Sequence, residues 1–295
     1  MASTNSPLRY PGGKSSLSGF MRLVFSMNDL CDGEYAEPYC GGAGVAMNLL
    51  VNEFVSKVHL NDVDPAIHAF WWCVLHDTKE LCRRVKTVKL SVATWRRQRT
   101  ILNSPADFSK EQLGFAAFFM NRVNRSGILA AGPIGGFAQT GEWGMDTRFN
   151  REALCRLIQT IAAYKDRICL SQLDALDFIQ VVLPALPRRS LVYFDPPYVV
   201  KGKRLYKNSY TAEDHGSIAN AIRALDRPHW IVSYDDVPLI TDLYRGFASS
   251  SYEINYSANR RSAGGELMFF SRDLVIPSVV SPVSVSQDAW RVAAA

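Results

Sequence analysis

The stretch that decides the fold is Leu191-Val192-Tyr193-Phe194-Asp195-Pro196-Pro197-Tyr198, in which four apolar residues run into an acid, two prolines and an aromatic ring. An apolar run this short, stopped by proline, is typical of a buried parallel strand. Because proline cannot donate a ladder hydrogen bond, the strand ends there and Asp195 lies at its carboxyl end, where open α/β sheets bind ligands. The alternative is a strand and a stiff turn without a chemical role.

This strand end also suits a particular reaction. The exocyclic amine of a nucleobase is a poor nucleophile because its lone pair is delocalised into the ring. Two acceptors, the Asp195 carboxylate and the Pro196 carbonyl, could bind its two N–H bonds and draw the nitrogen toward sp³ geometry. Tyr198 offers a ring on which a base could stack. The candidate catalytic residues are therefore Asp195, Pro196, Pro197 and Tyr198.

The bulk composition excludes several classes of protein. At 295 residues with 47% apolar and 21% charged residues, the chain suits one large globular domain or a domain with an insertion. No apolar run approaches membrane-spanning length and the polar start is no signal peptide, so we expect a cytoplasmic protein without a membrane partner. Six cysteines without a C-x-x-C pair and five scattered histidines predict reduced thiols and no metal site.

Near the N-terminus, Gly12-Gly13-Lys14-Ser15 invites a phosphate-loop interpretation. That motif needs a glycine where this chain has Leu8, and a strand before it, so we exclude a nucleotide triphosphatase. What remains is a tight turn that presents Lys14, which could hold a carboxylate.

A second glycine-rich turn, from Glu37 through Gly41, Gly42 and Gly44, joins a predicted strand to a predicted helix. The next strand ends at Asp62, 18 residues beyond Gly44. In dinucleotide-binding folds an acid at this spacing binds ribose hydroxyls, so the pair predicts a nucleoside-containing cofactor.

Another acid and aromatic pair, Asp177-Phe178, begins a later helix. The pair could bond to and stack on an adenine ring, or Phe178 could simply belong to the core.

Basic charge is concentrated in the predicted helical segment 75–161, which holds 14 lysine and arginine residues against 7 acidic ones, whereas the rest of the chain holds 19 against 21. This asymmetry suits a polyanion, although basic runs are often only a solvated helix face. Arginine and asparagine can also read base edges. Two further basic stretches occur, one near the proposed reaction site and one between two strands predicted to form a hairpin. The candidate DNA-binding residues are Arg96, Arg97, Arg99, Arg122, Asn124, Arg125, Lys201, Lys203, Arg204, Arg260 and Arg261.

Taken together, these motifs resemble those of the Dam-type (class alpha) DNA adenine N6-methyltransferases, whose signature is D-P-P-Y. The resemblance extends to about Arg272. It implies an α/β, Rossmann-like, S-adenosylmethionine-dependent methyltransferase sheet with an inserted, mostly helical target-recognition domain. We expect the catalytic domain at 1–74 and 162–275, the insert at 75–161 and a flexible tail at 276–295.

The resemblance also implies roles for individual residues. It makes Tyr10 and Lys14 N-terminal cofactor contacts, Asp62 the ribose-binding acid, and places Asp195 near the methionyl group. Its cofactor loop, E-P-F-x-G-x-G in the family, corresponds here to residues 37–44. The implied cofactor contacts are Tyr10, Lys14, Glu37, Gly41, Gly42, Gly44, Asp62, Asp177, Phe178 and Asp195.

The implied activity is transfer of a methyl group from S-adenosylmethionine to a flipped-out adenine in double-stranded DNA. We expect a monomer, and a cognate restriction endonuclease is a further partner that this role allows. One departure leaves the target sequence open: GATC-reading members carry a G-E-F-N-V-P-F-G-like hairpin, whereas residues 141–150 read GEWGMDTRFN.

Three alternatives stay open from the sequence. A cytosine-N4 methyltransferase would share the fold and the chemistry. A protein-glutamine methyltransferase more typically has N-P-P-Y and lacks the basic insert. A catalytically inactive DNA-binding relative, such as a repressor, would not need the acid at Asp195.

Overall fold

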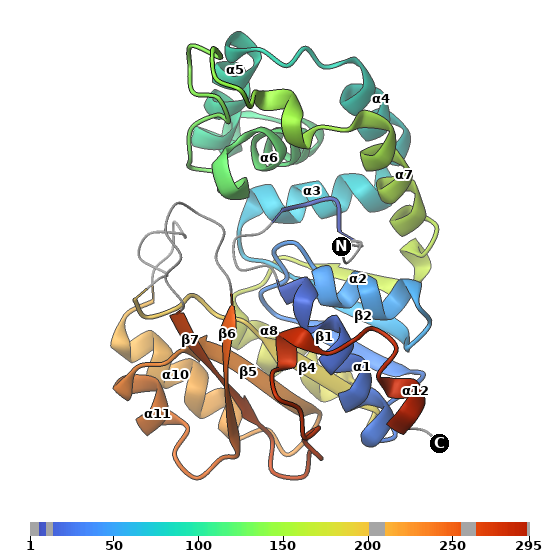
Figure 1. Cartoon of the computed structure of the whole chain (residues 1–295), viewed down its shortest axis with the longest axis vertical. Helices are drawn as coiled ribbons and strands as arrows, with labels where there is room; N and C mark the ends of the chain where they lie inside the picture. Colours follow the sequence, from blue (N-terminus) through green and yellow to red (C-terminus); the bar gives the residue numbers. More distant parts are fainter. Residues whose placement is uncertain (1–5, 10–13, 201–209, 255–263, 294–295) are drawn as a thin grey trace.

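The computed structural model describes residues 6–9, 14–200, 210–254 and 264–293. The strands of this described part form one sheet in the order β3-β2-β1-β4-β5-β7-β6 (Figure 1). Their bounds are β1 Gly33–Glu37, β2 Val55–Asn61, β3 Ile168–Ser171, β4 Ser190–Phe194, β5 His229–Asp235, β6 Ser249–Ile254 and β7 Gly264–Phe270.

Strands β1 to β5 pair in parallel, and β7 lies antiparallel between β5 and β6. The predicted hairpin is therefore confirmed, and so is the α/β class. Since β7 runs opposite to β5, its first residues lie beside the last residues of β5, with Glu266 opposite Asp235. This register brings a late segment of the chain to the edge of the sheet where the parallel strands end.

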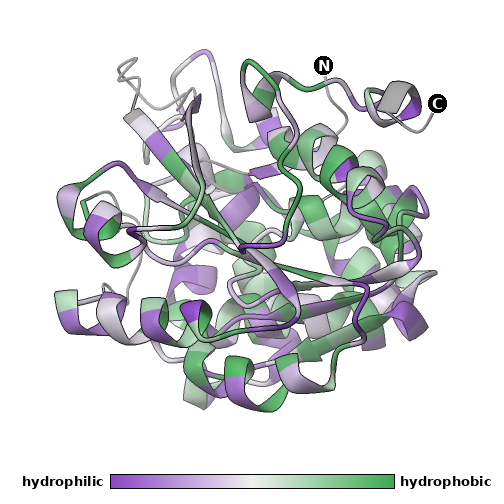
Figure 2. Cartoon of the chain, turned by 90° about the horizontal axis from the view of Figure 1, so that it is seen from below, coloured by the Kyte–Doolittle hydropathy of each residue, from purple (hydrophilic) through white to green (hydrophobic). Residues whose placement is uncertain are grey.

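Helices cover both faces of the sheet. In β4, Leu191 and Tyr193 join the core formed with α1 and α2, whereas Val192 and Phe194 join the core formed with α8, α10 and α11. Alternate residues of a strand point to opposite faces, so a strand that is buried on both sides is apolar throughout. Figure 2 shows apolar residues along the strands and on the helix faces turned toward them. The helices are α1 Ser18–Met27, α2 Gly44–Val51, α3 Pro65–His76, α4 Thr78–Thr87, α5 Val92–Asn103, α6 Lys110–Val123, α7 Arg151–Ala162, α8 Ala175–Val181, α10 Ala212–Arg223, α11 Pro238–Leu243 and α12 Trp290–Ala293.

Helices α3 to α7 follow β2 and precede β3, and α4, α5 and α6 lie at the end of the molecule away from the sheet (Figure 1). Helix α3 packs along α6 at short range: a Cβ added at Gly114 would lie 2.5 Å from the carbonyl oxygen of Ala69. The absence of a side chain at Gly114 thus allows the two helices to approach. Among the described helices, none is long and apolar enough to cross a membrane.

The C-terminal segment, for which the sequence predicts a flexible tail, contacts the rest of the chain through its described residues. Its described residues include the 3₁₀ turn Pro282–Ser284 and helix α12, which packs on α1. Arg22 donates to the carbonyl oxygen of Gln287 at 2.9 Å, and the rings of Phe54 and Trp290 meet edge to face at 5.0 Å. The polar, proline-containing composition of this segment gave no sign of these contacts, because the residues that it contacts lie near the N-terminus of the chain.

Candidate functional site

Asp195 lies directly after β4 at the carboxyl edge of the sheet, as predicted, with 24% of its side chain exposed. Ser233 in β5 donates a hydrogen bond of 2.9 Å to Oδ1 of Asp195, and the Tyr193 hydroxyl lies 2.7 Å from Oγ of Ser233. Burial raises the pKa of Asp195 and Glu266 raises it further, whereas Lys14 and Ser233 lower it. The carboxylate is therefore fixed in place and partly desolvated, yet still reachable.

Lys14 joins two carboxylates at this edge. Its Nζ lies 2.8 Å from Oε2 of Glu266 and 3.4 Å from Oδ1 of Asp195. Glu266 is fully buried, and the hydroxyl of Tyr198 donates to its Oε2 at 2.8 Å. Lys14 also bonds to the Tyr198 hydroxyl, and its Nζ lies 4.9 Å from the centre of that ring. From the sequence, Lys14 could hold a carboxylate. In the structure it lies beside two carboxylates of the protein itself, those of Asp195 and Glu266.

The proline turn is anchored by β5. Asp235 accepts hydrogen bonds from the backbone N–H groups of Val199 at 3.0 Å and Val200 at 2.8 Å. Pro196 is buried, and Tyr198 is 9% exposed. A stacking role for Tyr198 therefore concerns only a small exposed part of its ring, because Lys14 already contacts that ring.

The glycine turn and Asp62 form one unit. Oδ2 of Asp62 accepts from the N–H of Gly41 at 2.9 Å, and Oδ1 accepts from the N–H of Asp64 at 2.9 Å. Gly41 has φ +43°, a left-handed conformation that glycine adopts readily. A Cβ at Gly44 would lie 2.2 Å from Oγ of Ser15, so the turn also packs closely against the segment that begins with Lys14. Burial, and then the charge of Asp64, raise the pKa of Asp62 to about 7.

Glu37 points into the protein at the end of β1. Its Oε1 accepts from the Tyr35 hydroxyl and from the N–H of Ala46, both at 3.1 Å. Burial raises the pKa of Glu37 to about 8. The carboxyl group thus ties the glycine turn to the start of α2, and one of its oxygens is already used for that purpose.

The two residues of the Asp177-Phe178 pair, at the start of α8, lie in different environments. Asp177 is exposed in the first turn, whereas Phe178 is 1% exposed and lies in the core beneath the sheet. Of the two interpretations of Phe178, the structure therefore favours a core residue, because a ring so enclosed has no free face for an adenine. Gly42 is buried within the glycine turn.

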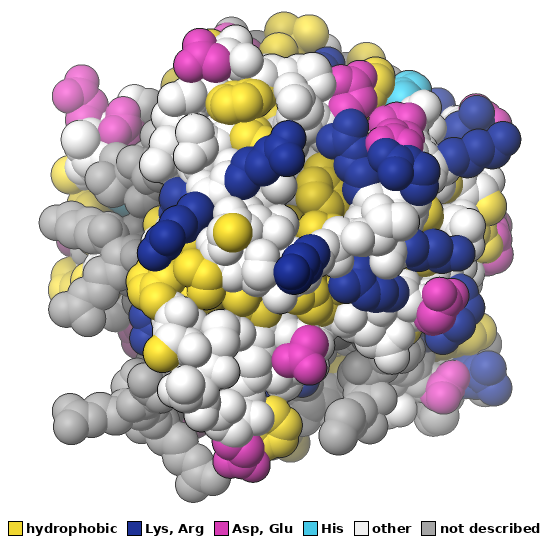
Figure 3. All heavy atoms as spheres, turned by 90° about the horizontal axis from the view of Figure 1, so that it is seen from above, with side chains coloured by type: hydrophobic (Ala, Val, Ile, Leu, Met, Phe, Trp, Pro, Cys, Tyr) yellow, Lys and Arg dark blue, Asp and Glu magenta, His cyan; other side chains and the backbone are white. Residues whose placement is uncertain are grey.

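The basic residues of the insert fall into two groups. Arg96, Arg97 and Arg125 are exposed. Arg99 donates to the carbonyl oxygen of Ala131 at 2.6 Å, and Arg122 donates to that of Arg148 at 2.9 Å. Burial lowers the pKa of Arg122 to about 10. Seen from above, the insert carries lysine and arginine side chains spread around an apolar strip (Figure 3).

Asn124 corrects the expectation of a base-reading side chain. It is fully buried, its Oδ1 accepts from Nε1 of Trp95 at 2.7 Å, and its Nδ2 donates to the carbonyl oxygens of Ile128 and Leu129 at 3.0 Å. Contact with a base would require these bonds to break. The Asn and Arg pattern did not reveal this, because burial depends on Trp95 from a different helix.

Four residues of the site were missed by the sequence reasoning. Ser233 and Asp235 lie at the carboxyl end of β5, so the strand-end rule applied to Asp195 would have found them. Glu266 reaches the site only through the antiparallel register of β7. Asn61, fully buried at the end of β2, donates to the carbonyl oxygens of Pro38 and Leu173 at 3.0 Å and so joins the turns after β1 and β3.

Other predicted residues lie outside the part of the chain that the structure describes: Tyr10, Lys201, Lys203, Arg204, Arg260 and Arg261. Within the described part, no three histidine, cysteine or acidic side chains cluster as metal ligands would.

Comparisons with known proteins complete the description of the site. A family model described as "D12 class N6 adenine-specific DNA methyltransferase" matches residues 10–259. No curated protein matches the chain significantly. Among solved structures, the rRNA methyltransferase AviRa from Streptomyces viridochromogenes is 14% identical, with a TM-score of 0.42 over 90% of this chain and 88% of that one. A SAM-dependent methyltransferase from Agrobacterium tumefaciens is 11% identical, with a TM-score of 0.38 over 86% of this chain and 61% of that one.

Proposed function

The chain belongs to the D12 class N6 adenine-specific DNA methyltransferase family, and on that basis we propose that Asp195 is the carboxylate that binds the amino group of its target adenine. The activity of the enzyme is methyl transfer from S-adenosylmethionine to N6 of adenine in DNA. The observation that carries the assignment of Asp195 is its contact with Ser233 and with Lys14, which Glu266 also binds.

The residues at the glycine turn fit S-adenosylmethionine. Each oxygen of Asp62 receives one backbone N–H and keeps a lone pair that a ribose hydroxyl can use. No cation lies within ion-pair distance of Asp62 among the described residues, so its remaining lone pairs are available to a ribose diol. We propose Asp62, Gly41, Gly42, Gly44 and Lys14 as cofactor-binding residues. When bound, the cofactor supplies an electrophilic sulfonium methyl group.

The proposed mechanism depends on position and polarisation. Asp195 and the carbonyl oxygen of Pro196 accept the two N–H bonds of the adenine amine, which frees its lone pair for in-line attack. Methylation of the amine would release a proton, and the raised pKa of Asp195 suits it to hold that proton. Direct attack needs no covalent enzyme intermediate, and no cysteine lies within residues 191–198 to form one.

DNA binding is assigned to the insert. We propose that the exposed Arg96, Arg97 and Arg125 contact phosphates, together with the basic residues outside the described part, and that the adenine is flipped out at a cost of about a few kcal/mol. To contact DNA phosphates, Arg99 and Arg122 would have to give up their hydrogen bonds to the backbone carbonyl oxygens of Ala131 and Arg148. We further propose a Dam-type enzyme with D-P-P-Y as its catalytic motif, an insert spanning 75–161, a cytoplasmic monomer and, where the context provides one, a cognate endonuclease partner.

The test compares Asp195→Ala with Asp236→Ala, which removes an exposed acid one residue beyond β5. Tritiated methyl transfer to DNA should be lost in Asp195→Ala and kept in Asp236→Ala, with N6-methyladenine as the product after digestion to nucleosides. Unchanged turnover in a folded Asp195→Ala protein would show that the carboxylate has another role.

A further inference from the structure

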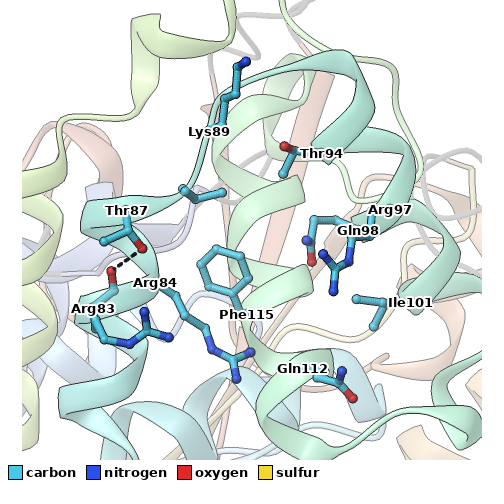
Figure 4. Close-up of a pocket in the computed structure, with 11 residues that line it drawn as sticks. Arg83, Arg84, Thr87, Lys89, Thr94, Arg97, Gln98, Ile101, Gln112 and Phe115 are labelled. Carbon is cyan, nitrogen blue, oxygen red and sulfur yellow. Dashed lines mark hydrogen bonds between the residues drawn. The ribbon is translucent and has the colours of Figure 1, made fainter.

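A cavity of about 430 Å³ opens among α4, α5 and α6, at the end of the insert away from the sheet (Figures 1 and 4). Its volume lies in the range of small-ligand sites. Arg84 from α4 and Arg97 from α5 extend toward the space around the Phe115 ring of α6 (Figure 4). The lining contains no acidic side chain. This cavity is separate from the site at Asp195.

The charge of the cavity is only partly compensated. Glu80 bonds to Arg83 at 2.6 Å and to Arg84 at 2.9 Å, and so offsets one of the four positive charges on the lining. Arg97 and Lys89 make no ion pair with any acidic residue of the described chain. A carboxylate would leave most of this charge unmatched, whereas a phosphate monoester carries about −1.5 to −2 at neutral pH. The charge therefore favours a phosphate group.

The rest of the lining suits a larger ligand than inorganic phosphate. Val88, Ile101 and Phe115 supply apolar wall. Gln98 lines the same cavity, is 7% exposed, and its Oε1 has no hydrogen-bond partner. A buried carbonyl oxygen without a donor is costly. A phosphate group and an apolar planar group occur together in a nucleotide.

We infer that this cavity is a second, non-catalytic site that binds a nucleotide, with its phosphate between Arg84 and Arg97 and its base against the apolar wall that Val88, Ile101 and Phe115 supply. The nucleotide is either a free 5′-mononucleotide or a phosphorylated DNA end, since both present the same groups. The inference does not depend on methyl transfer, so its failure would leave the proposed function untouched.

Calorimetric titration with dAMP tests the inference, with S-adenosylhomocysteine added in excess to fill the cofactor site. The matched variants are Arg97→Gln and Arg96→Gln, which remove one charge each from neighbouring positions of α5, of which only Arg97 lines the cavity. We expect Arg97→Gln to weaken dAMP binding about tenfold, the effect of one charge-assisted hydrogen bond, and Arg96→Gln less than twofold. Deoxyadenosine, which lacks the phosphate, should bind at least about tenfold more weakly than dAMP.

A competition experiment distinguishes the two sources. A short duplex with 5′-phosphates that displaces dAMP, where the same duplex without them does not, identifies a DNA end; failure of both duplexes to compete identifies a free nucleotide. Absence of dAMP binding at millimolar concentration, or equal binding by Arg97→Gln and Arg96→Gln, would overturn the inference.

Discussion

Lys14 and Glu266 are 252 residues apart in the sequence, yet Nζ of Lys14 lies 2.8 Å from Oε2 of Glu266 at the carboxyl edge of the sheet. Glu266 is fully buried, and the same lysine lies 3.4 Å from Asp195. A buried carboxylate is stable only when it is paired, so Glu266 and Lys14 depend on each other for their placement. The family model ends at residue 259, before Glu266.

Glu266→Gln should lower kcat about tenfold and change KM for DNA little, because the substitution loosens Lys14 and Tyr198 without removing a DNA contact. It should also shift the acidic limb of the pH profile of kcat/KM to lower pH, since Glu266 raises the pKa of Asp195 and its charge is lost. Initial rates between pH 5 and 9 measure both effects. Glu253→Gln, at an exposed position of β6, is the control. A uniform loss of activity with no shift of the limb would indicate a merely structural role.

Ser233→Ala should shift the acidic limb of the pH profile of kcat/KM to higher pH, opposite to the effect of Glu266→Gln. Ser233 donates to Oδ1 of Asp195 at 2.9 Å and thereby lowers the pKa of the carboxyl group. Without this donor the pKa rises, so Asp195 becomes protonated, and activity falls, at a higher pH than in the wild type. Ser249→Ala, an exposed position on β6, should leave the profile in place. If the limb moves the same way in Ser233→Ala and Glu266→Gln, it does not report Asp195.

The raised pKa of Glu37 predicts that the stability of the folded protein depends on pH. Its pKa is about 8 in the folded protein and near its ordinary value when unfolded. The folded state therefore keeps a proton that the unfolded state loses, and this contribution to stability is full below the unfolded pKa and disappears as pH rises toward 8. Glu37→Gln removes it.

Thermal unfolding checks this prediction. The Tm of the wild type relative to Glu37→Gln should fall as pH is raised from 5 to 9, with a change in unfolding free energy on the order of a few kcal/mol. The exposed substitution Glu142→Gln should show a constant difference from the wild type. A constant difference for Glu37→Gln as well would mean that Glu37 is ionised in the folded protein at all of these pH values.

Asn124 and Arg125 are neighbours with opposite expected effects. Asn124→Ala removes the acceptor for Trp95 and two bonds to backbone carbonyls, so it should destabilise the protein by about 2–3 kcal/mol. Arg125→Gln should leave Tm unchanged but lower the slope of log K for DNA against log salt by about one. Denaturant unfolding and fluorescence anisotropy at several salt concentrations separate the two. Weakened DNA binding by a fully stable Asn124→Ala would restore a base-reading role for Asn124.

The local sequence determined where most elements lie. Apolar runs stopped by proline or an acid located β4 and Asp195, glycine spacing located the turn at Gly41 and its partner Asp62, and the predicted helical segment 75–161 holds nearly all of α4 to α7. These features depend on backbone restrictions and on side chains close in the chain, which a sequence displays directly.

Only the tertiary structure decided what each side chain contacts. The register of β7 brought Glu266 to Lys14, the packing of α5 on α6 buried Asn124, and the second core enclosed Phe178. The anchoring of α12 on α1 joins helices from opposite ends of the chain, whereas the cavity at Arg97 forms where the consecutive helices α4, α5 and α6 pack together. Burial and pairing are properties of the assembled chain, because the free energy of a polar group depends on which distant atoms replace its water.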